Sequence, residues 1–332
     1  MNKKPKEETM THSIGIIGLG MIGESMLAEF LDHPEFTVVA CWDLNPEICS
    51  QIRTRYPAVP VVSSSEEVIE HADTEMIYIA TPPMTHVDYG IQVFGQKKAL
   101  LMEKPLALDL YEGKRLVELA AQTGLPNTMN FGYAAGPVVE TLEKIVANRE
   151  VGQVLSIEIR YEFPSWPLPN QLSAASWITN KFTGGMVREM FSHHVYLIHR
   201  LFGHLKVNMS WLSYPETENS AEAFALASLQ AGEIPVWFMG GIGSLKTPRN
   251  SNFTINGKEG VVRISEKQQL YSGQAGEWVP YQMEKTQTAS QARLDQIAQM
   301  LNGKPTTLPT IQDGYEVQSV IEDLLAKAGK SD

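Results

Sequence analysis

The chain has 332 residues, enough for two domains, because a single hydrophobic core stops growing at roughly 250–300 residues. Hydrophobic residues make up 43% and charged residues 20%, the composition of an ordinary soluble globular protein. The formal net charge is −11, and basic residues gather only in Lys3-Lys4-Pro5-Lys6. Nucleic acids and anionic membranes are therefore not expected partners.

Residues 1–12 are polar and are expected to form a flexible tail. The apolar stretch that follows, 14–22, is interrupted by glycines and is too short to span a bilayer. Of the two cysteines, Cys41 falls in an apolar run and Cys49 in a predicted helix. We therefore expect no structural disulfide and a cytoplasmic location.

Between residues 13 and 133, short apolar runs alternate with segments of helical spacing. Strands separated by helices indicate a parallel sheet covered on both faces, a doubly wound α/β domain of the Rossmann type. The predicted strands are 13–18, 36–42, 59–62, 75–80, 98–102 and 127–132, and the predicted helices are 22–32, 46–55, 85–95 and 109–123.

The pattern changes in residues 134–330. After a predicted helix from Pro137 to about residue 148, residues 153–163 alternate strictly between apolar and polar, which predicts a half-exposed strand. We expect an α+β domain with a large open, mostly antiparallel sheet. Further predicted strands are 206–213, 221–230, 234–242, 252–256 and 260–265, and further predicted helices are 289–301 and 312–328.

A glycine-rich loop joins the first predicted strand to the first predicted helix. Its spacing, Gly18-x-Gly20-x-x-Gly23, is that of the dinucleotide-binding fingerprint. Gly18 permits the tight turn, Gly20 lets the backbone approach a pyrophosphate, and Gly23 allows the helix to pack on the strand. The pyrophosphate is expected at the helix N-terminus, beside Met21 and Ile22.

An acidic residue completes the fingerprint. Asp43 lies twenty residues past Gly23, at the end of the second predicted strand. Its carboxylate is expected to accept hydrogen bonds from the adenosine ribose and to repel a 2′-phosphate. The next residues, Leu44-Asn45-Pro46, include no arginine or lysine. NAD is therefore the favoured cofactor, with NADP as the alternative.

Several motifs occur in an order typical of one family. They are "GIIGLGMIG" (15–23), "ATPPMTH" (80–86), "MEKPLAL" (102–108), "GG" (184–185) before "REMFSHHVYL" (188–197), and "DGYEVQSVIEDLLAK" (313–327). From residue 13 onward the chain resembles the Gfo/Idh/MocA family, the glucose–fructose oxidoreductase and myo-inositol dehydrogenase relatives. The resemblance implies NAD(P)-dependent hydride transfer on a sugar, polyol or related compound. It also implies that the second domain, residues 134–330, binds the substrate and makes dimer or tetramer contacts through its open sheet.

Three residues are the candidate catalytic groups. Lys104 ends a predicted parallel strand, where open α/β sheets bind their ligands. By itself it could be a solvated strand-end lysine, but the resemblance implies that it is catalytic. Glu189 and His193 are four residues apart in a predicted helix and so share a face, although Asp is commoner in the family where Glu189 stands. Either Lys104 or His193 could accept the proton. Glu189 and His193 could alternatively form an ordinary Glu–His contact on a solvated helix face.

Other residues are expected around the cofactor and the substrate. The family pattern places Thr81, Pro82 and Glu103 beside the cofactor, whereas His86 could be cofactor-adjacent or structural. Gly184-Gly185 would let the backbone approach the cofactor. The proline-rich stretch 163–171 is a reasonable place for substrate contacts. Candidates for the substrate pocket, besides Lys104 and His193, are Tyr133, Trp166, Trp177 and Arg188, any of which could instead be core.

Two departures from the family limit the choice of substrate. The stretch 133–137 lacks the usual arginine, and Tyr196 replaces an acid. No metal is expected, because His193, His194 and His199 do not share one helical face. The sequence thus predicts an NAD(P)-dependent oxidoreductase acting on a CH–OH group. An imine-type reductase on the same fold and a non-catalytic NAD(P)-sensing regulator are the alternatives.

Overall fold

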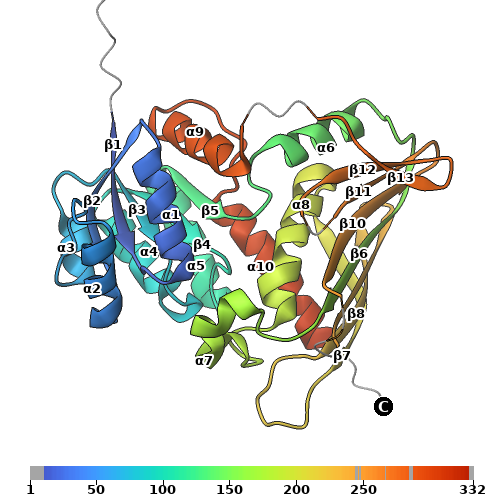
Figure 1. Ribbon diagram of the computed structural model, residues 1–332, viewed down its shortest axis with the longest axis horizontal. Coiled ribbons are helices and arrows are strands. Elements are labelled where there is room, and N and C mark those ends of the chain that lie inside the picture. Colours follow the sequence, from blue (N-terminus) through green and yellow to red (C-terminus); the bar gives the residue numbers. More distant parts are fainter. Residues whose placement is uncertain (1–10, 244–245, 247, 266, 284–286, 329–332) are drawn as a thin grey trace, which may run out of the picture.

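The computed structural model describes residues 11–243, 246, 248–265, 267–283 and 287–328. Two sheets of different construction flank a layer of helices (Figure 1). Most of the expected tail, residues 1–10, lies outside the described residues, and the first strand already begins at His12.

The first sheet is parallel and has five strands in the order β2-β1-β3-β4-β5. The order reverses between β1 and β3, which is the point where such sheets bind ligands at their carboxyl ends. The predicted doubly wound domain is confirmed. The strands are β1 His12–Ile17, β2 Phe36–Trp42, β3 Met76–Ile79, β4 Ala99–Glu103 and β5 Asn127–Asn130.

Helices cover both faces of this sheet because successive strand side chains point to opposite sides. On β3, Tyr78 belongs to the core cluster that includes Phe30, while Ile77 and Ile79 belong to the cluster that includes Phe94. The helices of this region are α1 Met21–Asp32, α2 Pro46–Arg55, α3 Ser65–Glu70, α4 His86–Gly95 and α5 Leu110–Thr123.

One predicted strand in this region is wrong, and one short helix was not predicted. The expected strand 59–62 is a single bridge between Val61 and Cys41, because Pro60 has no N–H with which to extend the ladder. Helix α3 was not expected, since six residues are too few to show a helical period. Its N-terminus is capped by the Ser64 hydroxyl, which accepts a hydrogen bond from the Glu67 N–H.

The second sheet has eight strands in the order β13-β12-β11-β10-β6-β9-β8-β7. Only the β6–β9 pair is parallel, so the expected open, mostly antiparallel sheet is confirmed. Strands β12 and β13 were not predicted. The strands are β6 Val154–Phe163, β7 Leu205–Ser213, β8 Phe224–Ala231, β9 Ile234–Ile242, β10 Asn250–Gly257, β11 Val261–Ile264, β12 Leu270–Gln274 and β13 Glu277–Pro280.

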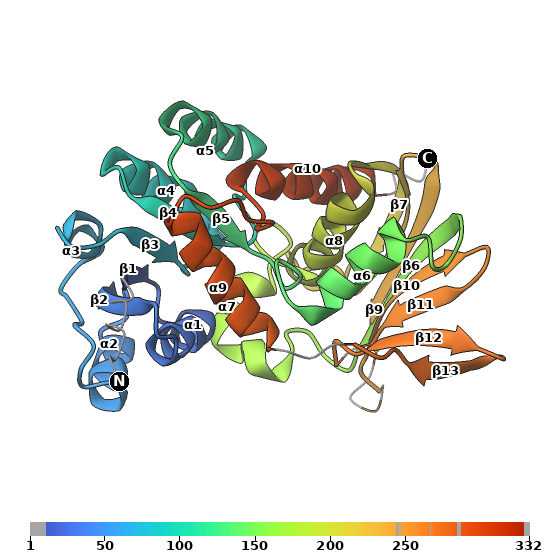
Figure 2. The same ribbon diagram turned by 90° about the horizontal axis from the view of Figure 1, so that it is seen from above.

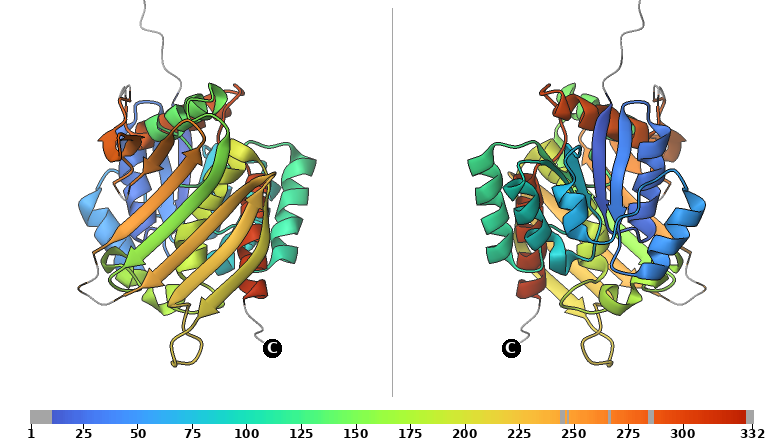
Figure 3. Two further views of the ribbon diagram at one scale, coloured as in Figure 1. Left: turned by 90° about the vertical axis from the view of Figure 1, so that its right-hand side faces the viewer. Right: turned by 90° about the vertical axis from the view of Figure 1, so that its left-hand side faces the viewer.

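One face of this sheet is covered and the other is open (Figure 3, left). Helices α6 Pro137–Ala147, α8 Ser192–Phe202 and α10 Ile311–Lys327 lie on the covered side. Strand β6 shows the alternation expected from its sequence: Ile157 and Ile159 are buried, whereas Glu158 and Arg160 are exposed.

Helix α9, Ala289–Leu301, returns to the first sheet although it follows the second sheet in sequence (Figure 2). Leu294 and Ile297 join the core cluster around Phe30 of α1. The Arg293 guanidinium donates to the Glu29 carboxylate at 2.8 Å. As a result, a segment remote in sequence forms part of the wall around the carboxyl ends of the parallel strands.

Candidate active site

A cavity of about 910 Å³ opens at the carboxyl ends of the parallel strands, where open α/β sheets bind their ligands. Segments that follow all five strands reach it, together with the turn before α8, α7 Ala175–Ile178 and α9. Of the predicted site residues, those that line it are Gly18, Gly20, Met21, Ile22, Asp43, Thr81, Pro82, Glu103, Lys104, Trp177, Glu189 and His193.

The glycine loop has the geometry that a pyrophosphate requires. Gly18 has φ +94°, and a Cβ there would lie 2.6 Å from the backbone of Ala80. A Cβ on Gly23 would lie 2.0 Å from the Gly18 oxygen, whereas nothing stands within 4 Å of one on Gly20. No side chain caps α1, so its first N–H groups remain available to an anion. The loop therefore fits a bound dinucleotide.

Asp43 is fixed by the backbone on both sides. One carboxylate oxygen accepts the Leu19 N–H at 2.7 Å, and the other accepts the Asn45 N–H at 2.8 Å. Each oxygen keeps a second lone pair, and the residue lines the cavity between Trp42 and Leu44. Among the described lining residues, the cations are Lys104 and Arg293, which belong to other parts of the wall.

Lys104 and Glu189 meet across the cavity wall. The Lys104 Nζ donates to Glu189 Oε2 at 2.5 Å and lies 3.3 Å from the Glu189 carbonyl oxygen. The side chains are only 12% and 5% exposed, so water screens this pair poorly. The other carboxylate oxygen, Glu189 Oε1, is buried without a partner among the described residues.

The segment that carries Glu189 is not the plain α-helix that was expected. Val187–Phe191 forms a π-helical turn, and α8 begins at Ser192. Such turns are rare and recur at functional sites. Here the wider turn sets the spacing that brings both Glu189 and His193 to the cavity.

His193 is held in one tautomer. Its Nδ1 accepts the Gly132 N–H at 3.1 Å, so the proton of the neutral ring is on Nε2. Burial, the nearby Lys104 charge and His194 hold the pKa of His193 well below its usual range. The ring is therefore neutral near pH 7 and offers an N–H donor from Nε2.

Glu103 and His86 support the strand ends. A Glu103 oxygen accepts the Tyr78 hydroxyl at 2.6 Å and the Asn130 amide at 2.5 Å. The His86 ring lies 2.8 Å from the carbonyl oxygens of both Thr81 and Pro105, and it does not line the cavity. Burial lowers the pKa of His86 although both carbonyls favour its charged form. His86 thus fastens the loop after β3 to the loop after β4.

Three of the expected substrate residues lie outside the cavity lining. The Tyr133 hydroxyl lies 3.2 Å from His194 Nε2, the Trp166 indole donates to the Ile178 carbonyl at 3.1 Å, and Arg188 pairs with Glu322 at 2.8 Å. The polar groups of these three side chains therefore bind other protein groups and do not face the cavity. The proline-rich stretch 163–171, expected to contact the substrate, reaches the cavity through Asn170 and Gln171. Ser173 and Ala174, which follow it, also line the cavity and were not predicted.

The paired glycines 184–185 do not line the cavity, contrary to expectation. A Cβ on Gly184 would lie 2.4 Å from the Ile178 carbonyl oxygen. Gly185 has φ +105°, and a Cβ there would lie 2.5 Å from the Glu222 carboxylate. That carboxylate accepts the Val187 N–H at 2.7 Å. The glycines therefore make room for backbone and for Glu222, which caps the turn that carries Glu189.

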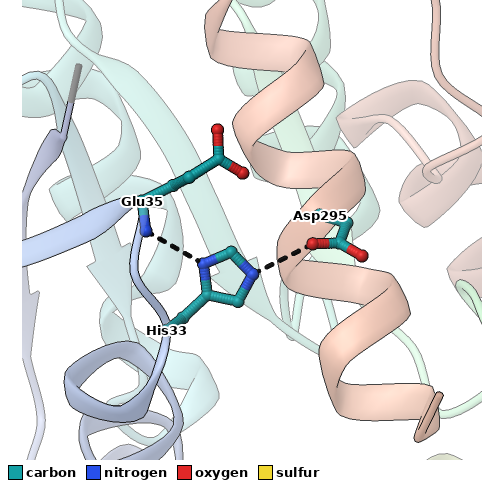
Figure 4. A group of neighbouring side chains, drawn as sticks. All are labelled: His33, Glu35 and Asp295. Atoms are coloured by element: carbon teal, nitrogen blue, oxygen red, sulfur yellow. Dashed lines mark hydrogen bonds and ion pairs between the residues drawn. The ribbon is translucent and has the colours of Figure 1, made fainter. Parts of the chain in front are cut away.

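A histidine and two carboxylates meet elsewhere, where α9 approaches the start of β2 (Figure 4). The ligand atoms of His33, Glu35 and Asp295 lie within 4.8 Å of one another. His33 Nδ1 accepts the Glu35 N–H at 3.3 Å, so Nε2 carries the proton donated to Asp295 at 3.0 Å. A cation on Nε2 would force that proton onto Nδ1, against the Glu35 N–H. In this arrangement the group fastens α9 to the start of β2.

Within the described part of the chain, no helix combines the length and apolarity needed to cross a membrane. The parallel sheet and the glycine cradle together define a dinucleotide-binding fold of the Rossmann type. The buried Lys104–Glu189 pair lies in the wall of the same cavity.

The comparisons with known proteins agree. Residues 12–131 match the NAD-binding Rossmann domain of the GFO/IDH/MocA oxidoreductase family, and residues 143–331 match its C-terminal alpha/beta domain. The chain belongs to this family, as its motifs indicated.

The named relatives include dehydrogenases of sugars and polyols. Levoglucosan dehydrogenase of Pseudarthrobacter phenanthrenivorans is 25% identical over 75% of this chain and 72% of its own length. Glucose-6-phosphate 3-dehydrogenase of Bacillus subtilis is 25% identical over 57% of this chain and 53% of its own length. Inositol 2-dehydrogenase of Rhizobium meliloti is 24% identical over 60% of this chain and 58% of its own length. The aligned region thus spans little more than half of the last two relatives.

Solved structures share the whole fold. The WlbA dehydrogenase of Bordetella pertussis, in complex with NADH and UDP-GlcNAcA, superposes with a TM-score of 0.80 over 97% of this chain and 98% of its own. GenD2 of gentamicin A biosynthesis, in complex with NAD, superposes with a TM-score of 0.80 over 100% of this chain and 98% of its own. Both are 18% identical to this chain, a level that supports the likeness of fold alone.

Proposed function

We propose that this protein is a dehydrogenase or reductase that transfers hydride between nicotinamide and a hydroxyl-bearing carbon of a sugar, polyol or related small molecule. The observation that carries the proposal is the Lys104–Glu189 pair, buried in the wall of the cavity that also contains the glycine loop. Relatives named for levoglucosan, glucose 6-phosphate and inositol support the substrate class.

Lys104 is assigned the proton transfer. Bound nicotinamide supplies the hydride acceptor or donor. In the oxidative direction, the Lys104 ammonium first releases its proton to solvent, and the free amine then takes the hydroxyl proton as the hydride leaves the same carbon. In the reverse direction the ammonium returns the proton to the substrate oxygen. Glu189 orients the Lys104 Nζ through the 2.5 Å contact.

His193 is assigned a different role, the donation of a hydrogen bond to the reacting oxygen. Its Nδ1 lone pair already holds the Gly132 N–H, so the ring cannot take a second proton without losing that bond. The Nε2–H, in contrast, can stabilise negative charge that develops on the substrate oxygen.

The cavity wall favours an uncharged, hydroxyl-rich substrate. Asn170, Gln171 and Ser173 offer amide and hydroxyl groups, and Trp177 offers an apolar surface for the C–H face of a ring. Among the described lining residues, the two cations are already paired, Lys104 with Glu189 and Arg293 with Glu29.

Assembly and location are part of the proposal. The open face of β7–β9 exposes apolar side chains, which we assign to contact with a second copy of the chain in a dimer or tetramer. These side chains are 39–56% exposed and are Met209, Trp211, Leu226 and Trp237. Cys41 and Cys49 are both free and buried, which supports a reducing cytoplasm.

The decisive experiment follows the absorbance of reduced nicotinamide with NAD and a panel of sugars and polyols, each beside its phosphorylated form. Turnover of unphosphorylated compounds that disappears in the Lys104→Met variant supports the proposal. Turnover only with cyclic imines would favour the imine-type reductase. Cofactor binding with no turnover on either panel would favour the regulator.

A further inference from the structure

The turn that follows β5, residues 131–134, carries the backbone N–H that binds His193. The Ala134 N–H donates to the Phe131 carbonyl at 3.1 Å and closes the turn. Within it, the Gly132 N–H donates to His193 Nδ1 at 3.1 Å. A backbone N–H can only donate, so Nδ1 presents its lone pair and Nε2 carries the proton of the neutral ring. The tautomer of His193 therefore depends on where this turn lies.

Helix α8, which carries His193, also holds the residue before Gly132. The Phe131 ring stacks on the Tyr196 ring, with centroids 4.7 Å apart and an interplanar angle of 7°. Phe131 also meets the His193 ring edge-on, at 6.2 Å and 90°. Phe131 and Tyr196 are at most 2% exposed, so close packing leaves the two rings little freedom to move.

The same helix holds the two residues after Gly132. The Tyr133 hydroxyl lies 3.2 Å from His194 Nε2. The Arg200 Nη1 donates to the Ala134 carbonyl at 2.6 Å. All four residues of the turn therefore contact α8, each through a different residue of that helix.

The two departures from the family pattern meet at this contact. The stretch 133–137 lacks the usual arginine, and Tyr196 replaces an acid. In the structure, the Arg200 guanidinium that holds the Ala134 carbonyl also lies 3.4 Å from the Tyr196 hydroxyl, and its Nε donates to Glu143 at 2.7 Å. Neither Tyr196 nor Arg200 lines the cavity, so an effect of either on the reaction must pass through another residue.

We propose that Tyr196 and Arg200 are positioning residues for His193: they hold the turn 131–134 against α8, so that the Gly132 N–H keeps the proton of the ring on Nε2. Without that N–H the two tautomers of a neutral imidazole compete, and a ring protonated on Nδ1 presents a lone pair from Nε2 in place of a donor. The reacting oxygen would then lose a hydrogen bond as negative charge develops on it. The inference rests on the proposed role of His193 and adds the contacts that enforce it.

Nuclear magnetic resonance reads the tautomer directly in the free protein, with the histidine rings labelled with ¹⁵N. Correlation spectra through the carbon-bound ring protons distinguish a protonated nitrogen from one that has a free lone pair. The chain has 8 histidines, and the His193 signals are those missing from the His193→Gln variant. The spectra are recorded at about pH 7.5 without any substrate.

Four variants separate these contacts from a general loss of packing. Tyr196→Leu removes the stack on Phe131, whereas Tyr196→Phe keeps it. Arg200→Met removes the bond to the Ala134 carbonyl and leaves both stacked rings in place. Phe94→Leu is the matched control, because it removes a similarly buried aromatic ring from α4, outside α8 and the turn.

The wild type should show one His193 species, protonated on Nε2. In Tyr196→Leu and Arg200→Met, the ¹⁵N shifts of the two ring nitrogens should move toward each other as the second tautomer becomes populated. The kcat of these variants should fall about three- to tenfold, the effect of one hydrogen bond. Tyr196→Phe should keep the wild-type tautomer and kcat. Phe94→Leu should lower the thermal unfolding midpoint and leave the tautomer unchanged.

An unchanged His193 tautomer in Tyr196→Leu and Arg200→Met would overturn the proposal, and so would an equal displacement in Phe94→Leu. If Tyr196→Leu does not fold, the comparison of Arg200→Met with Phe94→Leu decides, because Arg200 holds the same turn by a different contact. A displaced tautomer in a protein that turns over no sugar or polyol would overturn the proposed reaction and leave the positioning contacts standing. A displaced tautomer with unaltered kcat would confirm the contacts and contradict the role assigned to His193.

Discussion

The ammonium of Lys104 lies 2.5 Å from the carboxylate of Glu189, although 85 positions separate the two residues in the chain. Lys104 comes from the end of β4 and Glu189 from the π-helical turn before α8. The contact therefore joins the parallel sheet to the second region at the place where the dinucleotide cavity ends. It gives the lysine a fixed direction, which an isolated strand-end lysine would lack.

Replacing Lys104 with methionine should separate catalysis from cofactor binding. The variant keeps the length of the side chain but cannot exchange a proton, so turnover should fall by about 10²- to 10⁴-fold. The dissociation constant for NADH should change only about twofold to threefold, because the loop after β1 is untouched. Steady-state rates and fluorescence titration measure the two effects. The exposed Lys114→Met variant is the matched control, and retained turnover in Lys104→Met would exclude lysine as the proton-transfer group.

Substituting His193 by glutamine distinguishes a hydrogen-bond donor from a base. Glutamine places an N–H near the position of imidazole Nε2, so turnover should fall only about tenfold or less, whereas His193→Leu should lose about a hundredfold. The pKa of His193 lies well below its usual range, so the ring stays neutral through the interval around pH 6.5 in which a free histidine titrates. The pH profiles of kcat/KM for wild type and His193→Gln should therefore have the same shape in that interval. A limb near pH 6.5 that vanishes in the variant would identify His193 as the base.

Asp43 should decide the preference between NAD and NADP. Asparagine in its place keeps the shape but removes the charge that repels a 2′-phosphate. The ratio of the dissociation constants for NADP and NAD should therefore fall by about three- to tenfold. Glu47→Gln, an exposed change at the start of α2, should leave the ratio unchanged. An unaltered ratio in Asp43→Asn would assign the preference to other residues.

Acid should destabilise the fold through its buried histidines. Burial lowers the pKa of His194 to about 3, and the pKa of His193 and of His86 is lowered as well. The unfolded chain takes up these protons near pH 6.5, so stability is lost as the pH falls below that value, by up to about 1.4 kcal/mol per pH unit for each histidine.

Urea denaturation at pH 7.5, 6.5 and 5.5 measures this effect, and His194→Gln removes one of the groups. The variant should show a shallower loss of unfolding free energy than wild type between pH 6.5 and 5.5. Because the other titrating groups are common to both proteins, the difference reports His194. Parallel curves would mean that His194 takes up its proton in the folded protein as readily as in the unfolded chain.

The open sheet face gives a prediction about assembly. Trp237 of β9 is 50% exposed and belongs to the apolar patch on β7–β9. A lysine there would put a charge into the proposed contact between copies, so Trp237→Lys should shift the mass measured by light scattering toward the monomer. Glu118→Lys, an exposed change on α5, should not. A monomeric wild type at micromolar concentration would contradict the assignment.

Much of the molecule was predictable from local patterns. Strand and helix periods are short-range properties, so they predict the parallel strands and their helices, and the glycine spacing with Asp43 identifies the dinucleotide loop. The family resemblance also selected Lys104, Glu189 and His193, which the structure brings to one cavity. The errors were local as well: a proline-limited bridge at Val61 and a helix too short to show its period.

What the sequence determined by itself is therefore the class of protein and the residue types at the strand ends. The tertiary structure alone decided how the remaining residues are used. Arg188 and Tyr133 face internal partners rather than the cavity, the paired glycines admit Glu222, and α9 carries Arg293 back to the first sheet. These outcomes depend on which surfaces pack together after the chain has folded. No period of two or 3.6 residues encodes such long-range contacts.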